Sequence, residues 1–532
     1  MRFSERLRHL RLSDPLFALT VTAAFVFLAG WTAIHHEMWR DELQAWLLAR
    51  DSASPFELFR QMKYEGHPAL WHLLLMPLTR LTWSPEIMQV FHLAIAATTV
   101  WLVARYAPFP QPLRAMFAFG YFPFYEYSIL CRNYALGMLL LVLLCLLWER
   151  RYERFLSVGL VLFLLAHTSV HALILGIVIG GALGVEASFR FTRLRDDPNV
   201  SLRVVWVGFA MIALGIVTSV IQMNPPADTG FAVGWRTTLD RADAENVVTI
   251  VTRAFLPIPN DHVNYWETHW LSSYYRLPLY VAVGCVLLTA LSVWRYPTLL
   301  AIYLGGTVGL LMFFYVKYVG AMRHHGFIFL AFFTVSWLGR VESAGDGRRL
   351  TVWTRRYGTA FVALVLSAQV IGGWKAARLD WQHLFTNAPA AAETLRELGL
   401  DTLPIIGERD LELSAIVGHL EVRRIYYVRA ERWGSFVRWD KARLSDAPDE
   451  KIVAAAERFR DDPEYPNRVV IVMGRTLKPE TLEGEPLLSK AAEVIEPSTV
   501  ADERYFIYVY GNPHPNPLNR RSDQGAATPA IR

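Results

Sequence analysis

The sequence contains few cysteines and few charged residues. Only three of its 532 residues are cysteines, Cys131, Cys145 and Cys285, and all lie in or beside apolar segments without a CxxC spacing. This pattern supports neither a disulfide framework nor a zinc knuckle, and redox chemistry is not indicated. Charged residues make up only 19% of the chain and hydrophobic residues 53%. Such a composition excludes an ordinary soluble enzyme of this length and indicates a membrane protein.

The sequence contains several long apolar runs with few charged residues. A membrane-spanning helix needs about 20 mostly apolar residues, and the runs 16–34, 204–221 and 277–293 are examples. The first run is too long for the core of a signal peptide and no small-residue cleavage site follows it, so we expect a retained first helix. The net charge of +5 comes largely from arginines in short loops between the runs. It therefore indicates membrane orientation and gives no support for nucleic-acid binding.

Arginine-rich segments predict which loops face the cytoplasm. They are Arg2, Arg6, Arg8 and Arg11; Arg150, Arg151 and Arg154; Arg190, Arg193, Arg195 and Arg203; and Arg340, Arg348, Arg349, Arg355 and Arg356. The loop 35–86 then lies outside and Arg150 lies inside, so an odd number of spans must join them. Four apolar stretches lie between them. The stretch 67–81 is short and polar in places, so we expect it to lie at the membrane interface. The stretches 87–106, 115–124 and 134–148 then cross, with 115–124 the weakest of them.

The predicted fold is an α-helical polytopic membrane protein of about eleven transmembrane helices with a small C-terminal α/β domain. Residues 1–374 would form the transmembrane domain, with residues 35–86 as its first extracytoplasmic loop. Residues 375–511 would form a soluble extracytoplasmic domain, and the polar tail 512–532 is predicted to be disordered. In the soluble part, apolar runs at 403–407, 424–428, 469–474 and 505–510 alternate with helical patterns at 390–398, 411–420 and 451–460. Because this part has no GxGxxG or P-loop, nucleotide binding is not indicated.

The segment HHEMWRDELQAWLLARDS, residues 35–52, places Asp41 and Glu42 at a membrane boundary before an amphipathic helix. Paired carboxylates at such a place suit a general base or a cation site. The alternative is that they cap the helix, since acidic residues favour helix N-termini.

The same loop ends in YEGHPALWH, residues 64–72, which contains Glu65, His67 and His72. Imidazole and main-chain amides at a helix start can bind a lipid phosphate. Alternatively, the Gly-His-Pro turn merely starts a helix.

A later outside turn, YEYSILCRNYAL at 125–136, contains Glu126, Arg132 and Tyr134. Arg132 would suit an anionic oxygen, and the alternative is an internal ion pair between Glu126 and Arg132. His167 and His171, four residues apart, fit either a metal site or polar residues at a helix end.

The turn KYVGAMRHHG, residues 317–326, carries Lys317, Arg323, His324 and His325. Positive charge is disfavoured on the outer face without an anionic partner, so this cluster favours phosphate binding.

The order WRDE, amphipathic helix, EGHPALWH, CRNYAL and basic turn resembles the GT-C superfamily of integral-membrane glycosyltransferases. Its bacterial members related to protein mannosyltransferases and the lipid A aminoarabinose transferase are most similar, over roughly the first 340 residues. The resemblance implies transfer of a sugar from a polyprenyl-phosphate carrier to an extracytoplasmic acceptor, with inversion, at a bacterial inner membrane. It implies Asp41 as the catalytic carboxylate with Glu42 beside it and His67 facing the donor phosphate.

Further members of this predicted site follow from position and charge. Arg132, Arg323, His324 and Lys317 are predicted to bind the donor phosphate, and Glu65, Glu126 and Tyr134 to contact the substrate. The partners would be the lipid-linked sugar, membrane lipids and a glycan, lipid or protein acceptor. The residues leave open whether a divalent cation such as Mg²⁺ or Mn²⁺ takes part. A lipid or solute transporter is the alternative function, although its ionisable groups would be expected at the bilayer midplane.

Overall fold

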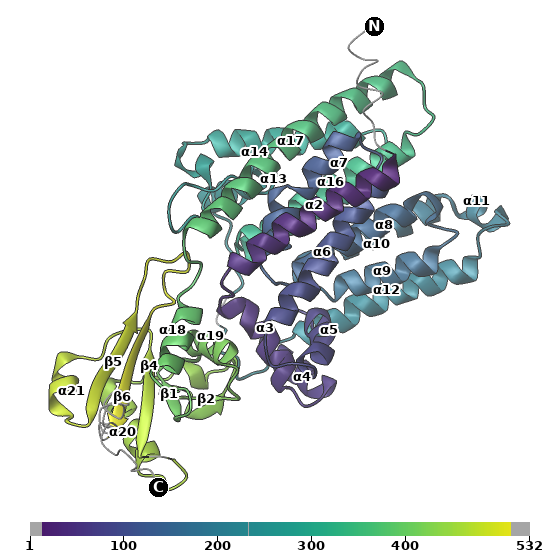
Figure 1. The fold of residues 1–532 in the computed structure, drawn as a ribbon. Coiled ribbons are helices and arrows are strands. Elements are labelled where there is room, and N and C mark those ends of the chain that lie inside the picture. The colour runs from purple at the N-terminus through teal and green to yellow at the C-terminus, as the bar shows by residue number, and fades with distance from the viewer. Residues whose placement is uncertain (1–12, 232–233, 466, 512–532) are drawn as a thin grey trace, which may run out of the picture. The chain divides into compact units, whose positions relative to one another are not determined.

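The computed structural model describes residues 13–231, 234–465 and 467–511, whose contacts form two compact units. The helical unit extends to Thr386 and includes Arg438–Asp440 and Pro497–Ala501. The sheet unit consists of Asn387–Val437, Lys441–Glu496 and, among the described residues, 502–511. Figure 1 traces both along the chain. The N-terminal arginines and the tail 512–532, both named in the sequence analysis, lie outside the described residues.

The helical unit begins with helices α2 to α9 and continues with helices α10 to α17. The first group is α2 (Asp14–His35), α3 (Arg40–Asp51), α4 (Pro55–Met62), α5 (Leu70–Thr79), α6 (Glu86–Tyr106), α7 (Gln111–Ala118), the π-helix η1 (Tyr121–Glu126), α8 (Tyr134–Leu147) and α9 (Phe155–Ala166). The second is α10 (Val170–Phe189), α11 (Phe191–Asp196), α12 (Leu202–Met223), α13 (Arg241–Phe255), α14 (Leu277–Val293), α15 (Pro297–Val316), α16 (Met322–Glu342) and α17 (Arg349–Gln382).

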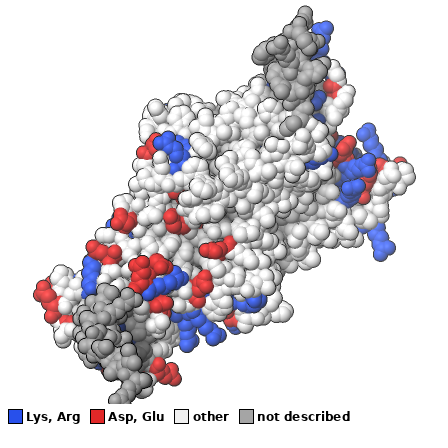
Figure 2. All heavy atoms as spheres, viewed as in Figure 1, with Lys and Arg blue, Asp and Glu red and all other residues white. Residues whose placement is uncertain are grey.

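Six helices in the described part of the chain are long and apolar enough to cross a membrane: α2, α6, α10, α12, α15 and α17. The shorter helices α5, α9 and α14 are also apolar. In Figure 2, charged side chains are sparse over a broad surface of the helical unit. These are features of a multi-pass membrane protein. The predicted number of about eleven spans is not confirmed.

The stretch 67–81 forms the short helix α5. Its ten residues rise about 15 Å, roughly half the thickness of the hydrocarbon core. This length agrees with the prediction that the stretch does not cross, while its position at the interface stays a prediction.

The stretch 115–124 does not form one continuous helix. Helix α7 ends at Ala118, and the chain restarts at Tyr121 as the π-helix η1. Here α17 packs closely on the break, because a Cβ atom added to Gly373 would lie 3.0 Å from the carbonyl oxygen of Phe119. The expected span is thus two short helical pieces joined at Gly120, and the close approach of α17 occupies the break.

The sheet unit is an α/β domain built on one six-stranded sheet of order β3-β2-β1-β4-β6-β5. The strands are β1 (Ile405–Gly407), β2 (Ile425–Tyr427), β3 (Arg432–Gly434), β4 (Arg468–Met473), β5 (Leu488–Val494) and β6 (Tyr505–Gly511), and the helices are α18 (Ala388–Glu397), α19 (Asp410–Leu420), α20 (Asp449–Arg460) and α21 (Pro479–Gly484). Strands β2, β1 and β4 are parallel, and the other pairings are antiparallel.

The four predicted strands and three predicted helices of this domain are present, with small shifts at their ends. The sheet unit begins at Asn387, whereas residue 375 was expected, because α17 continues to Gln382. Strands β3 and β5 were not predicted. β5 is an edge strand whose residues are mostly exposed, so it lacks the apolar run that marked the inner strands.

Candidate active site

Helix α3 carries both acidic residues of the WRDE segment, but it places them in different surroundings. Glu42 is fully buried. One of its oxygens accepts a hydrogen bond from the main-chain N–H of Cys131 at 2.6 Å, and the other accepts one from Trp39 N–H at 3.3 Å. The bond from Trp39 is the reciprocal half of a capping box. These contacts favour the helix-capping alternative for Glu42.

Asp41, one position earlier, lies between two arginines from distant segments. Its Oδ2 atom is 3.1 Å from Arg132 Nη1 and 3.4 Å from Arg323 Nη2. Arg132 also donates to the Asp41 carbonyl oxygen at 2.7 Å. The Asp41 side chain keeps 29% of its surface exposed, so it is accessible to a ligand. The structure therefore brings together three of the residues that the sequence predicted for chemistry.

These arginines control the charge of Asp41. Burial raises the pKa of Asp41, but the positive charges of Arg132 and Arg323 outweigh it, so that the pKa lies below its ordinary value. Asp41 is consequently ionised at neutral pH. While it stays paired, it is also a weak proton acceptor.

Arg323 is shared between two carboxylates. Its Nη1 atom donates to Glu267 at 2.9 Å, while its Nη2 atom faces Asp41. Glu267 also accepts from the main-chain N–H of Met322 at 2.8 Å. The Arg323 guanidinium lies 5.2 Å from the ring centre of Trp266 and 5.7 Å from that of Trp39, contacts that favour a flat cation. Four side chains thus hold Arg323 in one orientation.

Glu267 has a left-handed backbone conformation, with φ of 68°. This conformation costs a non-glycine residue on the order of 1 kcal/mol or more. The sequence analysis did not identify Glu267, because a single acidic residue in an aromatic loop forms no motif. The strained backbone and the ion pair with Arg323 mark it as part of the site.

The start of α16 is fixed by close packing against the chain near η1. The hydroxyl of Tyr127 donates to the Arg323 carbonyl oxygen at 2.6 Å. A Cβ atom added to Gly326 would lie 2.2 Å from that hydroxyl oxygen and 2.5 Å from the Phe122 ring. Only glycine fits at this contact, which positions Arg323 one turn away.

Glu65 and His67 form a second group in the same loop system. Their nearest side-chain atoms are 3.8 Å apart, and His67 stacks on His72 with ring centres 5.4 Å apart. Burial raises the pKa of Glu65 to about 7, and burial lowers that of His67 to about 4. Near pH 6 both side chains are therefore uncharged. Gln44 donates to Glu65 at 2.7 Å and links the group to α3.

Three further residues that the sequence predicted for the site contact other groups: Glu126, His324 and Lys317. Glu126 is buried and accepts from Tyr121 at 2.8 Å and Trp266 at 3.2 Å, whereas Arg132 pairs with Asp41. His324 accepts the N–H of Ala321 at 2.7 Å, which caps α16. The Lys317 ammonium lies 4.9 Å from the ring centre of Trp235.

Tyr134 and His171 complete a ring cluster around His324. Their ring centres lie 5.5 Å and 4.8 Å from that of His324. Both His171 nitrogens are buried without a hydrogen-bond partner among the described residues. In residues 13–231, 234–465 and 467–511, no group of three or more His, Cys, Asp or Glu side chains is arranged to hold a metal ion. The participation of a divalent cation, which the sequence leaves open, is not tested by this arrangement.

Comparisons with known proteins complete the description. No family model matches the sequence, and no curated protein matches it. The structure is similar to a crystal structure of ArnT from Cupriavidus metallidurans bound to undecaprenyl phosphate, with a TM-score of 0.48 and 11% sequence identity over 92% of this chain and 97% of that one.

Proposed function

We propose that this protein is a glycosyltransferase that moves a sugar from a polyprenyl-phosphate carrier to an acceptor hydroxyl, with inversion at the anomeric carbon. The observation that carries the proposal is the partly exposed carboxylate of Asp41 held between Arg132 and Arg323. Such a group of one carboxylate and two guanidinium groups supplies a proton acceptor and an anion site in contact with each other.

The charges around Asp41 allow an exchange when the donor binds. Arg132 and Arg323 are balanced by Asp41 and Glu267, and a phosphate that links a sugar to a carrier adds one negative charge. The phosphate then competes with both carboxylates for the two guanidinium groups. Asp41 is the weaker partner of Arg323, at 3.4 Å compared with 2.9 Å for Glu267. The donor phosphate therefore displaces Asp41, whose proton affinity rises as its positive neighbours turn to the phosphate.

The proposed reaction is a single displacement. The acceptor oxygen forms a bond to the anomeric carbon as the bond from that carbon to the phosphate oxygen breaks. Asp41 takes the acceptor proton. The departing carrier phosphate gains a second negative charge, which Arg132 and Arg323 stabilise in a partly dehydrated site. His67, uncharged at neutral pH, would offer a hydrogen bond to the same phosphate.

We infer that this site faces the extracytoplasmic side of a bacterial inner membrane. The inference rests on the arginines of α11 and of the start of α17, which the positive-inside tendency assigns to the cytoplasm. A transporter is the alternative function, for which ionisable groups would be expected at the bilayer midplane, and a transfer assay separates the two.

The proposal is tested by binding of the purified full-length protein to a polyprenyl phosphate, compared with the matching polyprenyl alcohol. We expect saturable binding of the phosphate and much weaker binding of the alcohol. A transfer assay with a polyprenyl-phosphate sugar then tests catalysis. Equal binding of phosphate and alcohol, or of neither, would overturn the proposal.

A further inference from the structure

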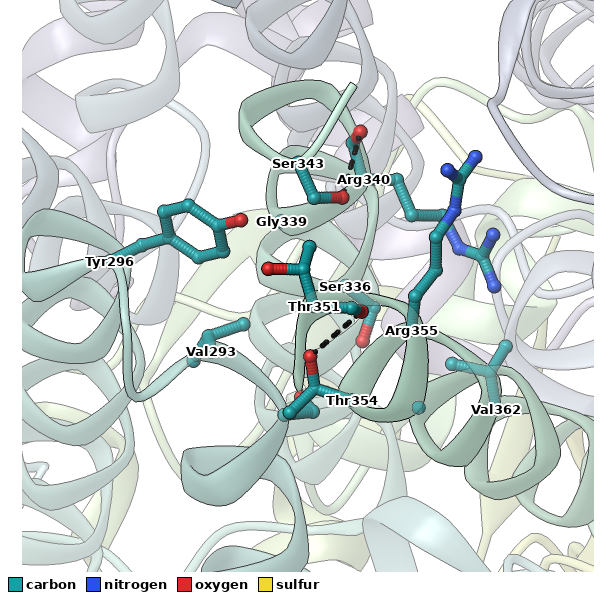
Figure 3. Close-up of a pocket in the computed structure, with 12 residues that line it drawn as sticks. Val293, Tyr296, Ser336, Gly339, Arg340, Ser343, Thr351, Thr354, Arg355 and Val362 are labelled. Atoms are coloured by element: carbon teal, nitrogen blue, oxygen red, sulfur yellow. Dashed lines mark hydrogen bonds between the residues drawn. The ribbon is translucent and has the colours of Figure 1, made fainter. Parts of the chain in front are cut away.

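A hydroxyl-rich pocket lies between α14, α16 and α17, away from Asp41 (Figure 3). Its polar lining consists of the hydroxyls of Ser292, Tyr296, Ser336, Ser343, Thr351 and Thr354 together with two arginines, Arg340 and Arg355. The empty space is about 420 Å³, including its open mouth. In Figure 3 both arginine side chains lie on the same side of the pocket.

The pocket and the candidate active site lie at opposite ends of one helix. Arg323 is in the first turn of α16 and Arg340 is in its last turn. The 21 residues of α16 rise about 30 Å, which is close to the thickness of the hydrocarbon core. The pocket is therefore at the end of α16 opposite to Arg323 and its partner Asp41.

The two pocket arginines have no carboxylate partner in the described residues. The two nearest acidic residues along the chain are engaged elsewhere. Glu342 accepts from Trp148 at 2.9 Å and pairs with Arg151 at 3.2 Å, and Asp346 pairs with Arg348 at 2.8 Å. The two arginines thus line one pocket without a direct ion pair in the described residues, although Asp346 reaches its edge by accepting from the Thr351 hydroxyl at 2.9 Å. Two guanidinium groups placed in this way favour an anionic ligand.

The other contacts of these arginines leave room for such a ligand. Arg340 donates to the carbonyl oxygen of Pro108 at 3.3 Å and to the Thr359 hydroxyl, and Arg355 is exposed. The Ser336 hydroxyl is buried without a partner among the described residues, so it can donate to an anion.

Apolar and aromatic side chains surround this end of the helices. Trp294, which follows α14, is 51% exposed, and Trp353 in α17 is 63% exposed. Leu291 and Leu350 are also exposed. Tryptophan at this level is typical of the membrane–water interface. A ligand that has a phosphate in the pocket and acyl chains along these side chains would satisfy both kinds of surface.

We propose that this pocket binds the phosphate of an anionic phospholipid in the leaflet opposite to the candidate active site. Arg340 and Arg355 would supply the positive charge, and Ser336 a neutral donor. The proposal does not depend on glycosyl transfer.

The test measures binding of phosphatidylglycerol to the purified full-length protein by native mass spectrometry, with diacylglycerol and inorganic phosphate as comparison ligands. The variant R340Q/R355Q should lower phosphatidylglycerol occupancy about tenfold. The matched control is R349Q/R356Q, which removes the same charge from two exposed arginines of α17 that do not line the pocket. It should keep the occupancy of the unchanged protein.

The single variant R355Q separates lost binding from lost folding, because the Arg355 side chain is exposed. It should lower occupancy several-fold without changing the melting temperature. Equal losses in both double variants would show unspecific attraction to a basic surface and overturn the proposal. Tight binding of inorganic phosphate without phosphatidylglycerol, or equal binding of diacylglycerol, would also overturn it.

Discussion

The Nε2 atom of His36 lies 3.0 Å from the Oε2 atom of Glu42, in a contact from which solvent is excluded. The other ring nitrogen of His36 lies 3.0 Å from Asp380 near the end of α17. Burial lowers the pKa of His36, but the charges of the two carboxylates outweigh it and raise the pKa well above its ordinary value. A protonated His36 therefore ties the start of α3 to α17 through two carboxylates.

This clamp predicts that Glu42 stabilises the protein and takes no direct part in transfer. Glu42→Ala leaves His36 with Asp380 alone and the Cys131 N–H without its partner, and we expect a loss of about 3 kcal/mol in unfolding free energy. Thermal melting in detergent measures it. The control is Glu245→Ala, which removes a surface ion pair with Arg241 and should cost less than about 1 kcal/mol. Unchanged melting with lost turnover in Glu42→Ala would contradict this role.

A substitution at Asp41 is predicted to have a different effect from one at Glu42. Asp41→Asn keeps the shape but removes the proton acceptor, so turnover should fall about 100-fold or more. Donor binding should be as tight as before or tighter, because one competing negative charge has been removed. The control is Asp51→Asn at the other end of α3, where Asp51 pairs with Arg50. Normal turnover in Asp41→Asn would exclude Asp41 as the base.

Arg323 and Glu267 are predicted to act as a unit in donor binding. Arg323→Ala removes a charge-assisted contact and should weaken carrier binding at least tenfold. Arg323→Lys should recover only part of it, since a point charge cannot reach Asp41 and Glu267 together in the same way. Equilibrium binding of a polyprenyl phosphate measures both, with Arg241→Ala as an exposed control.

Glu267→Gln tests the same unit from its other side. It should lower turnover with a smaller effect on melting, because Arg323 loses the group that orients it. Carrier binding that is unaffected by every substitution at Arg323 would contradict the assignment.

The raised pKa of Glu65 predicts a stability profile with a definite sign. Its folded pKa of about 7 lies above the ordinary value of 4.5, so its contribution is complete below pH 4.5 and is lost as pH rises through 7. The loss amounts to about 3 kcal/mol at most. His67, with a lowered pKa, acts in the opposite sense. The measurement is therefore the difference in melting temperature between the unchanged protein and Glu65→Gln from pH 4.5 to 8.

If Glu65 carries the effect, the melting temperature of the unchanged protein falls relative to that of Glu65→Gln as pH rises. His67→Asn should remove the opposing trend and leave the change that Glu65 causes. A pH-independent difference for Glu65→Gln would contradict the raised pKa.

The predicted orientation can be tested by cysteine labelling in intact cells and inverted vesicles. The native Cys131, Cys145 and Cys285 are buried, so background labelling should be low. Arg276→Cys should react from the outside and Arg195→Cys from the cytoplasm. The reverse pattern would place the candidate active site on the cytoplasmic face and contradict the proposed acceptor side.

The sequence predicted those parts of the protein that rest on periodicity and charge. The apolar runs became long helices, and the inner strands of the sheet unit appeared where alternation was strong. Asp41, Arg132 and Arg323 could be named because each belongs to a short polar segment at a helix end. Glu267 could not, since its role depends on a backbone conformation and on a partner 56 residues away. The position of Glu42 beside Asp41 suggested a catalytic role. Its hydrogen bonds, which the sequence does not reveal, favour the helix-capping alternative.

A residue without a side chain governs the position of Arg323, the proposed phosphate-binding residue. At Gly326 the helix α16 touches the Tyr127 hydroxyl and the Phe122 ring so closely that a single methyl group has no room. A saturation-mutagenesis map would therefore record position 326 as intolerant in the same manner as the polar residues of the site. Loss of activity alone would then wrongly assign Gly326 to the active site. The map becomes interpretable when variants at Gly326 are distinguished by lost melting temperature and those at Asp41 by lost turnover.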